Sequence, residues 1–410
     1  MKAILKPGTS PNKPIPINIS GSKSESNRML ILQAQFPNIL IKNISESDDT
    51  KALQEGIKVF NGTVDVHHAG TAMRFLTAYF AAKKGAQITL TGSKRMQERP
   101  IGILVNALKS LGADIEYLKN EGFPPLKIKG TTLKKSEVKM KADVSSQYIS
   151  ALMLVAPMLS NGLRIILEGK TTSIPYIEMT LSLLKQLGIK GDFNKNEIIV
   201  PATKKIGDKT LIVESDWSSA SYFYSLVSLS ENFKMVLRSF SGASLQGDSA
   251  LVQIYETLGV QTVFNDLEKT ISLSKTHTAL PDTLMLDLAN TPDLAQTIAV
   301  SCFGLGIGCN LSGLHTLKIK ETDRLLALKC ELEKLGAKIQ VDDSALMLQK
   351  TTKMNAAVSI ETYQDHRMAM AFAPLALKTN IVINEAEVVS KSYPNFWNDL
   401  QHTGIFCEFL

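Results

Sequence analysis

The feature that most constrains the fold is a repeated unit of helix, glycine and strand. In six places along the 410 residues an apolar amphipathic stretch stops at a glycine and leads into a short alternating segment. Four copies end in Leu-Gly, at Gly112, Gly188, Gly259 and Gly336, and two weaker copies end at Gly62 and Gly404. Glycine is typical of a helix C-terminus that needs positive φ. Each copy therefore predicts a helix that ends near its glycine and is followed by a strand.

A second set of helices alternates with the first. We expect these helices to begin near Arg28, Ala72, Tyr148, Ala220, Leu294 and Met368. Strands are expected after some of them, for example at 87–90, 164–167 and 381–384. Alternating helices and strands indicate an α/β fold. Six such units suggest two domains of three, with a crossover around 213–216, although the sequence alone also allows one continuous array.

The composition narrows the classes of function. A chain of this length exceeds one ordinary domain, and 44% hydrophobic with 20% charged residues is typical of a soluble globular protein. No uncharged apolar stretch reaches about 18 residues, so we expect no membrane partner. The N-terminus lacks the apolar core of a signal peptide. The four cysteines and six histidines show no metal-binding spacing. These features predict a cytoplasmic protein without a metal.

The positive charge is mild and scattered, at a net +6. A short lysine-rich stretch at 134–141 is interpreted as a solvated strand edge. Nucleic-acid binding would require a denser basic face with stacking aromatic residues. We therefore expect no nucleic-acid partner.

The second set of helices carries unusual polar residues at its N-terminal ends. The segment from Gly21 to Arg28 puts two cations and three hydroxyls at the start of an apolar helix, and Ser22 with Glu25 has the spacing of a capping box. A helix start offers free N–H groups and partial positive charge, which favour a phosphate or carboxylate. The alternative is an ordinary capped helix with solvated charges.

Similar residues occur at the other five helix starts. They are Gly70-Thr71, Ser145-Ser146-Gln147, Asp216-Trp217-Ser218-Ser219, Thr291-Pro292-Asp293 and Asp365-His366-Arg367. At Thr291 we expect an N-cap, with proline in the first helical position. Each end alone fits a plain helix cap, and Glu321 with Arg324 fits a surface ion pair. Because repeats place equivalent ends on equivalent faces, we expect the six ends to converge on one anion-binding cleft.

The motifs together resemble the 5-enolpyruvylshikimate-3-phosphate synthase family of enolpyruvyl transferases. The matching segments are Gly21–Arg28, Ala69–Arg74, Arg95–Gly102, Ser145–Gln147, Lys320–Leu325 and Asp365–Met370, in the family's order over nearly the whole chain. The resemblance implies two similar α/β domains, each of three βαβαββ repeats around a pseudo-threefold axis (an inside-out α/β barrel), with the active site in the interdomain cleft. It places the N-terminal domain at 22–214 and the C-terminal domain at 1–21 plus 215–410.

The resemblance also implies the chemistry. The 5-hydroxyl of shikimate 3-phosphate would add to C2 of phosphoenolpyruvate, and a tetrahedral intermediate would then lose phosphate, as a step toward chorismate and the aromatic amino acids. No cofactor is implied, and we expect a monomer. Asp293 would accept the hydroxyl proton and Glu321 would act as the acid, although the proton roles of Lys23, Asp293 and Glu321 are not separable from sequence.

Binding residues follow from the same resemblance. Shikimate 3-phosphate would be held by Lys23, Ser24, Arg28, Ser145, Ser146, Gln147, Ser173, Tyr176, Asp293, Thr316 and Lys320. Phosphoenolpyruvate would be held by Lys23, Gly70, Thr71, Arg99, Gln147, Arg324, His366, Arg367 and Lys391. The substrates carry roughly −6 together, so we expect the domains to close on them. Two departures, His68 and Phe75, lie beside the phosphoenolpyruvate residues and leave the effect of the family inhibitor glyphosate open.

Two other functions are the alternatives. The sister transferase that acts on UDP-N-acetylglucosamine uses a cysteine loop in its N-terminal half, whereas no cysteine precedes Cys302 here. A non-catalytic anion-binding or nucleic-acid-binding protein on the same scaffold would bind without turnover. The presence of both Asp293 and Glu321 argues against that second alternative.

Overall fold

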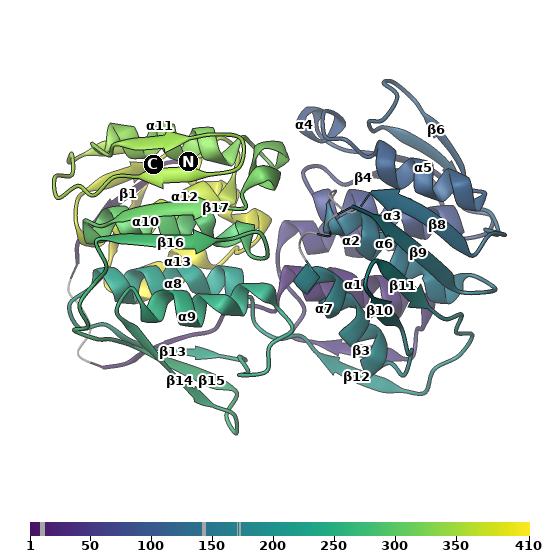
Figure 1. The fold of residues 1–410 in the computed structure, drawn as a ribbon, viewed down its shortest axis with the longest axis horizontal. Helices are drawn as coiled ribbons and strands as arrows, with labels where there is room; N and C mark the ends of the chain where they lie inside the picture. The colour runs from purple at the N-terminus through teal and green to yellow at the C-terminus, as the bar shows by residue number, and fades with distance from the viewer. Residues whose placement is uncertain (9–12, 142–144, 170, 172–173) are drawn as a thin grey trace. The chain divides into compact units, whose positions relative to one another are not determined.

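Two compact units make up the structure, a computed structural model that describes residues 1–8, 13–141, 145–169, 171 and 174–410. Unit 1 comprises Met1–Ser20 and Glu214–Leu410, and unit 2 comprises Gly21–Val213 (Figure 1). Unit 2 is therefore one uninterrupted stretch of chain. Unit 1 is completed by the N-terminal segment.

Unit 2 is built from repeats of the order β-α-β-α-β-β. One repeat contains β4 (Asn61–Asp65), α3 (Gly70–Ala82), β5 (Gln87–Thr91), α5 (Gly102–Leu111), β6 (Asp114–Tyr117) and β7 (Leu126–Lys129), with α4 (Lys94–Gln97) before α5. The next contains β8 (Glu137–Lys141), α6 (Ser146–Val155), β9 (Leu163–Glu168), α7 (Ile174–Gln186), β10 (Asp192–Asn194) and β11 (Glu197–Val200). The third combines α1 (Lys23–Gln35), β3 (Ile39–Lys42) and α2 (Asp48–Lys58) with β12 (Lys209–Ile212).

Unit 1 contains three repeats of the same kind. The first has β2 (Ile15–Ile17), α8 (Trp217–Leu229), β13 (Lys234–Arg238), α9 (Leu251–Glu256), β14 (Val260–Asn265) and β15 (Thr270–Lys275). The second has β16 (Thr283–Asp287), α10 (Ala295–Leu305), β17 (Gly308–Ser312), α11 (Arg324–Lys334), β18 (Ile339–Val341) and β19 (Leu346–Leu348). The third has β20 (Val358–Ile360), α12 (His366–Phe372), β21 (Ile381–Ile383), α13 (Phe396–His402), β22 (Phe406–Phe409) and, from the other end of the chain, β1 (Ala3–Lys6).

The strand order is the same in every four-stranded sheet. In β4-β5-β7-β6 the first two strands are parallel and the other pairs are antiparallel. The sheets β8-β9-β11-β10, β2-β13-β15-β14, β16-β17-β19-β18 and β20-β21-β1-β22 follow the same rule. In the described residues, the sixth sheet has two parallel strands, β12 and β3. The mixed α/β repeat expected from the sequence is therefore confirmed.

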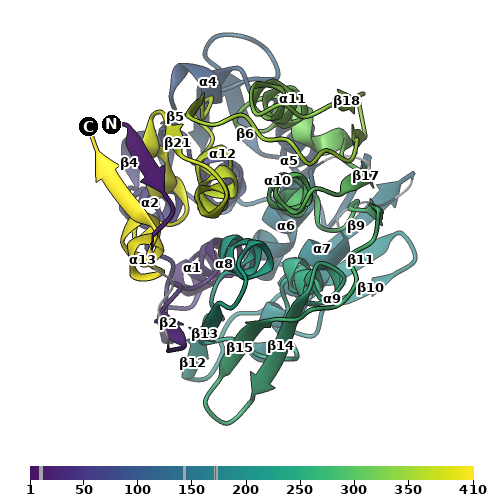
Figure 2. The ribbon, with the colours of Figure 1, turned by 90° about the vertical axis from the view of Figure 1, so that its left-hand side faces the viewer.

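The first helix of each repeat forms the core of its unit. Every residue of α12 is buried, and so are the residues of α3 from Gly70 to Ala81. In unit 1, α8, α10 and α12 pack against one another, and Figure 2 shows them end-on with sheets outside them. Burial on all sides explains why these helices are apolar around their circumference. Their N-terminal turns are the places where polar side chains can be presented.

The structure corrects several expected boundaries. Five of the first helices begin two to five residues before the expected start, because most of the residues that precede the apolar run are polar or glycine. All six repeat glycines have positive φ, but Gly62 lies inside β4 rather than at a helix end. Among the described residues, the side chains of Ser22 and Thr291 make no capping hydrogen bond. The predicted capping box is therefore absent, and buried Glu25 instead lies near Arg28.

The lysine-rich stretch forms β8, an edge strand whose lysines are exposed, as expected. None of the helices in the described ranges has the length and apolar character needed to cross a membrane. Within those ranges no group of three histidine, cysteine or acidic side chains is arranged to hold a metal ion.

Candidate active site

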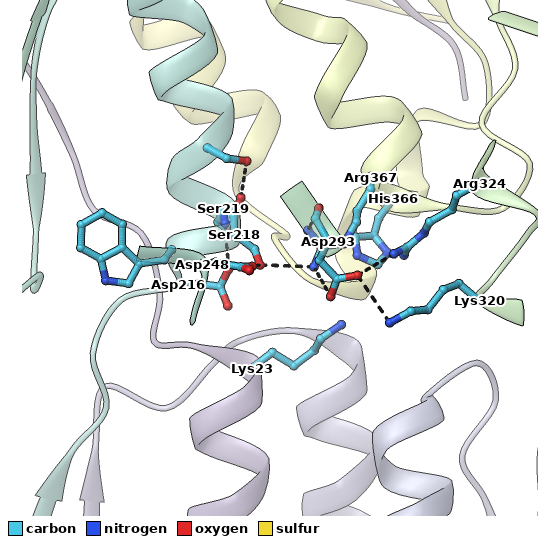
Figure 3. Close-up of polar contacts among 12 residues, drawn as sticks. Lys23, Asp216, Ser218, Ser219, Asp248, Asp293, Lys320, Arg324, His366 and Arg367 are labelled. Carbon is cyan, nitrogen blue, oxygen red and sulfur yellow. Dashed lines mark hydrogen bonds and ion pairs between the residues drawn. The ribbon is translucent and has the colours of Figure 1, made fainter. Parts of the chain in front are cut away.

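Three acidic residues mark the starts of the core helices in unit 1. Asp216 caps α8 by accepting from Ser219 N at 2.8 Å, and Asp365 caps α12 by accepting from Arg367 N at 2.9 Å. Asp293 lies in the 3₁₀ helix η3 (Pro292–Leu294), directly before α10. Figure 3 shows Asp216 at the start of α8 and Asp293 beside Lys320, Arg324 and Arg367. The repeat thus brings together acidic residues that lie about 75 residues apart in sequence.

Arg324 joins three carboxylates. Its side chain is only 2% exposed. Nε donates to Asp365 Oδ2 at 2.6 Å, Nη1 to Asp293 Oδ1 at 2.8 Å, and Nη2 to Glu321 Oε2 at 2.8 Å. Burial alone would lower the pKa of Arg324, but the three carboxylates outweigh it and raise the pKa above its ordinary value. The Glu321–Arg324 contact is therefore part of a buried network, and not the surface ion pair that the sequence allowed.

Asp293 is surrounded by cations. Its side chain is 16% exposed, and its carboxylate lies 3.5 Å from Lys320 Nζ and 3.2 Å from Arg367 Nη2. Arg367 Nη1 also donates to the Asp293 carbonyl at 3.2 Å. Burial would raise the pKa of Asp293, but the charges of Arg367, Lys320 and Arg324 hold it well below its usual range. Asp293 is thus an ionised carboxylate that can accept a hydrogen bond from a hydroxyl.

A strained turn directly precedes α12. Tyr363 and Gln364 both have positive φ, at 53° and 58°. Such backbone is uncommon for residues other than glycine and needs support from its surroundings. Buried Glu331 supplies it by accepting from Tyr363 Oη at 2.6 Å, and Lys391 Nζ donates to the Gln364 carbonyl at 2.7 Å. This turn sets the direction of the Asp365-His366-Arg367 segment.

The N-terminus of α3 in unit 2 gathers two guanidinium groups. Arg74 Nη1 donates to the Gly70 carbonyl at 2.7 Å, and both Arg74 and Arg99 are buried. A Cβ atom on Gly70 would lie 2.7 Å from Arg99 Nη1 and 2.8 Å from Arg74 Nη1. Gln147, from the start of α6, donates to Thr71 Oγ1 at 3.2 Å. Two guanidiniums at a helix N-terminus form an environment suited to a phosphate or carboxylate.

Arg28 has protein partners for much of its guanidinium. It donates to Thr180 Oγ1 at 2.8 Å, to Ser150 Oγ at 2.9 Å and to the Ser24 carbonyl at 2.8 Å. Burial lowers its pKa to about 10. Its guanidinium also lies over the rings of Phe75 and Tyr176. Arg28 therefore ties α1 to α6 and α7 through its guanidinium.

Most of the remaining predicted site residues lie at helix starts, and Thr316 lies in a 3₁₀ helix. Lys23 and Ser24 are in the first turn of α1, where Lys23 Nζ lies 3.4 Å from Asp49 Oδ2. Ser145 caps α6 and Ser146 begins it. Thr316 lies in the 3₁₀ helix η4 (His315–Ile319), and among the described residues its hydroxyl has no hydrogen-bond partner. His366 is buried as the first residue of α12. Ser173 lies outside the described residues.

Two carboxylates beside predicted site residues did not emerge from the sequence. Asp49 contacts Lys23, and Asp248 accepts a hydrogen bond from Ser218. Asp49 follows a serine N-cap at Ser47, which is a visible but common signal. Asp248 lies in a short 3₁₀ helix with no motif that marks it. Both contacts join residues far apart in sequence, so only the tertiary structure reveals them.

Comparison with known proteins places the chain in a family. The family model described as EPSP synthase (3-phosphoshikimate 1-carboxyvinyltransferase) matches residues 57–400. A 3-phosphoshikimate 1-carboxyvinyltransferase of Bacteroides fragilis is 45% identical over 392 residues, or 95% of each chain. One of Shewanella pealeana is 35% identical over 93% of this chain and 95% of its own length. The EPSP synthase structure from Acinetobacter baumannii matches the fold with a TM-score of 0.77 at 19% identity, covering both chains completely. The chain belongs to the EPSP synthase (3-phosphoshikimate 1-carboxyvinyltransferase) family.

Proposed function

We propose that this chain transfers the enolpyruvyl group of phosphoenolpyruvate to the 5-hydroxyl of shikimate 3-phosphate and releases phosphate. Its family has 3-phosphoshikimate 1-carboxyvinyltransferase activity in the shikimate pathway. The observation that carries the proposal is the environment of Asp293, whose ionised carboxylate is contacted by Lys320, Arg324 and Arg367. A base beside three cations suits a reaction in which a hydroxyl must lose a proton while anionic groups are held.

The reaction requires two proton movements. In the addition step the 5-hydroxyl oxygen bonds to C2 of phosphoenolpyruvate, its proton passes to a base, and the methylene carbon gains a proton. In the elimination step the C2–O bond to phosphate breaks and the new methyl group returns a proton. We propose Asp293 as the acceptor of the hydroxyl proton, with Glu321 and Lys23 as the groups that serve the methylene carbon.

Substrate charge gives Asp293 a suitable basicity. A carboxylate with so low a pKa takes up a proton poorly in the empty protein. A phosphate next to Arg367 and Arg324 would cancel part of the positive field that depresses this pKa. Binding of the anionic substrates would thereby raise the pKa of Asp293 toward the working pH. We propose that the base becomes effective only when the anions are in place.

The groups of unit 2 supply a second set of anion contacts. Gly70, Thr71, Arg99 and Gln147 lie together at the starts of α3 and α6. We propose that they bind phosphoenolpyruvate, together with Lys23, Arg324, His366, Arg367 and Lys391. Shikimate 3-phosphate is assigned to Lys23, Ser24, Arg28, Ser145, Ser146, Gln147, Ser173, Tyr176, Asp293, Thr316 and Lys320. The monomeric state and the cytoplasmic location stay predictions.

Alanine at Gly70 tests the phosphoenolpyruvate assignment. The added Cβ would push the Arg74 and Arg99 guanidiniums away from the start of α3, because both lie under 3.0 Å from its position. Losing one well-placed contact to a charged group is worth about 1.5–3 kcal/mol, so we expect KM for phosphoenolpyruvate to rise about 10- to 100-fold. Gly207→Ala is the control, since a Cβ there meets nothing within 4 Å. Equal KM values in the two variants would remove Gly70 from the site.

An assay of phosphate release tests the activity itself. We expect inorganic phosphate to appear only when phosphoenolpyruvate and shikimate 3-phosphate are both present, because the leaving phosphate departs from an intermediate that contains both. Release of phosphate with UDP-N-acetylglucosamine in place of shikimate 3-phosphate would instead identify the transferase that acts on UDP-N-acetylglucosamine. Binding of both substrates without release would show a protein that binds anions but does not catalyse the transfer.

A further inference from the structure

The first turn of α8 is held by the segment 246–248. Gln246 Oε1 accepts from Trp217 N at 3.0 Å, and Gln246 Nε2 donates to the Ser215 carbonyl at 2.9 Å. Two residues later, Asp248 Oδ2 accepts from the Ser218 hydroxyl. Asp248 belongs to the 3₁₀ helix η2 (Gly247–Ala250), and its side chain reaches a serine 30 residues earlier in the chain. The segment thus fixes both the backbone and a hydroxyl at the start of α8.

The Ser218 hydroxyl continues toward the proposed active site. Arg367 Nη2 donates to Ser218 Oγ at 3.3 Å and lies 3.2 Å from Asp293 Oδ2 (Figure 3). A hydroxyl has one hydrogen to donate. Because Ser218 gives that hydrogen to Asp248, its oxygen turns a lone pair toward Arg367. A hydrogen-bonded chain therefore runs from Asp248 through Ser218 to the guanidinium beside Asp293.

Asp248 occupies an unfavourable position for a carboxylate. It is 6% exposed, and among the described residues its Oδ1 has no hydrogen-bond partner. Burial raises the pKa of Asp248 to about 6; the charges of Asp293 and Asp216 also raise it, whereas the charge of Arg367 and the Ser218 hydroxyl lower it. A carboxylate whose folded-state pKa exceeds its ordinary 3.8 destabilises the fold once the pH passes that range. Fold stability alone would favour a neutral residue at this position.

We propose that Asp248 is a positioning residue for the transfer reaction. By taking the Ser218 hydrogen it makes Ser218 an acceptor for Arg367, and so it holds that guanidinium against Asp293 in the orientation that receives the substrate anion. A neutral residue would accept the hydroxyl more weakly or donate to it, which lets Ser218 turn its own hydrogen toward Arg367. The inference rests on the proposed function, because it assigns Asp248 a part in that same reaction.

Asp248→Asn separates this role from a structural one. We expect KM for phosphoenolpyruvate to rise about 10-fold with a smaller change in kcat, since orientation of a binding group is lost and the base remains. The melting temperature at pH 7 should be equal to or above that of the wild type. The difference between variant and wild type should grow as the pH rises from about 4 to about 6, the window in which the folded wild type still holds the proton of Asp248 that the unfolded chain has already released. A marked fall in melting temperature at pH 7 would indicate a structural residue and overturn the proposal.

Glu214→Gln is the matched control. Glu214 is also a carboxylate whose pKa burial raises, and it too accepts from a serine, Ser244. It also accepts from Trp217 Nε1, so it supports the same helix without contacting Ser218 or Arg367 through any described hydrogen bond. We expect this variant to alter the melting temperature and leave KM for phosphoenolpyruvate unchanged. An equal rise of KM in both variants would overturn the specific role of Asp248.

A double-mutant cycle and a ligand-free measurement complete the test. If Asp248 acts through Ser218, Ser218→Ala and the double variant should have KM values for phosphoenolpyruvate within about 2-fold of each other. Full additivity of the two single effects would contradict the proposal.

Nitrogen-15 NMR of the guanidinium groups, with Arg367 assigned through Arg367→Lys, should show hindered Nη rotation of Arg367 in the empty wild type. That hindrance should be lost in Asp248→Asn. An unchanged Arg367 signal would overturn the proposal. A wild type without phosphate release would overturn the proposed function instead, because the NMR comparison needs no turnover.

Discussion

Asparagine in place of Asp293 is expected to lower kcat by about two to four orders of magnitude, the usual contribution of a positioned general base. The amide keeps the size and one acceptor oxygen of the carboxylate but cannot take up the proton of the 5-hydroxyl. The KM values for the two substrates should change less than kcat, because Arg324 and Arg367 stay in place to bind the anions. Steady-state rates of phosphate release at saturating concentrations of both substrates measure the effect.

Asp343→Asn is the control for this substitution. Asp343 also pairs with a lysine, Lys318, but the carboxylate is exposed and lies on a loop. We expect that variant to keep the wild-type kcat. A kcat for Asp293→Asn within about 10-fold of the wild type would remove Asp293 from the role of base.

The effect of Asp293→Asn on the melting temperature should depend on pH. The depressed pKa of Asp293 means that its contribution to folding is complete above its ordinary pKa of 3.8 and is lost as the pH falls further. Asparagine does not titrate, so the difference in melting temperature between wild type and Asp293→Asn should stay constant from pH 7 to about 4 and shrink as the pH is lowered further toward 3. A difference that stays constant over the whole range would show that the cations around Asp293 do not favour its ionised form.

Methionine in place of Arg324 is expected to destabilise unit 1 by about 3–5 kcal/mol, the usual effect of breaking a buried ion pair from one side. Asp293, Glu321 and Asp365 would lose the cation that they share, and their negative charges would repel one another in a poorly solvated site. Activity should be lost as well. Urea unfolding at pH 7, followed by circular dichroism, measures the change in the free energy of unfolding.

Arg164→Met tests whether burial causes that effect. Arg164 also pairs with two carboxylates, Glu137 and Glu197, but on an exposed sheet surface. We expect a small change in stability there, since water solvates the carboxylates that remain. Equal losses in the two variants would contradict the buried-network explanation.

The repeat and the helix N-termini could be predicted because their signals are local. Gly112 and Gly336 adopt the positive φ that a helix end requires, and the Asp365-His366-Arg367 segment does begin a core helix. The hydrophobic pattern predicts the helix starts too late where the first turn is polar, as at Lys23 in α1. A hydrophobic pattern detects only the part of a helix that contacts the core.

The contacts of the candidate site could not be predicted in the same way. Arg324 and Asp365 meet across 41 residues, and Ser218 and Asp248 across 30, and neither spacing has a local rule. Such pairs depend on strand order and on the turn that supports Asp365.

The placement of the first two strands affects how the polypeptide matures during translation. Unit 2 is contiguous and can fold as soon as it has left the ribosome, since domains generally fold as units in the order of their synthesis. β1 and β2 emerge earlier, but β2 pairs with β13, and β1 pairs with β21 and β22. β1 and β2 must therefore wait for strands that are synthesised much later. A nascent chain halted before residue 381 would carry unpaired strand edges, which favour association between chains.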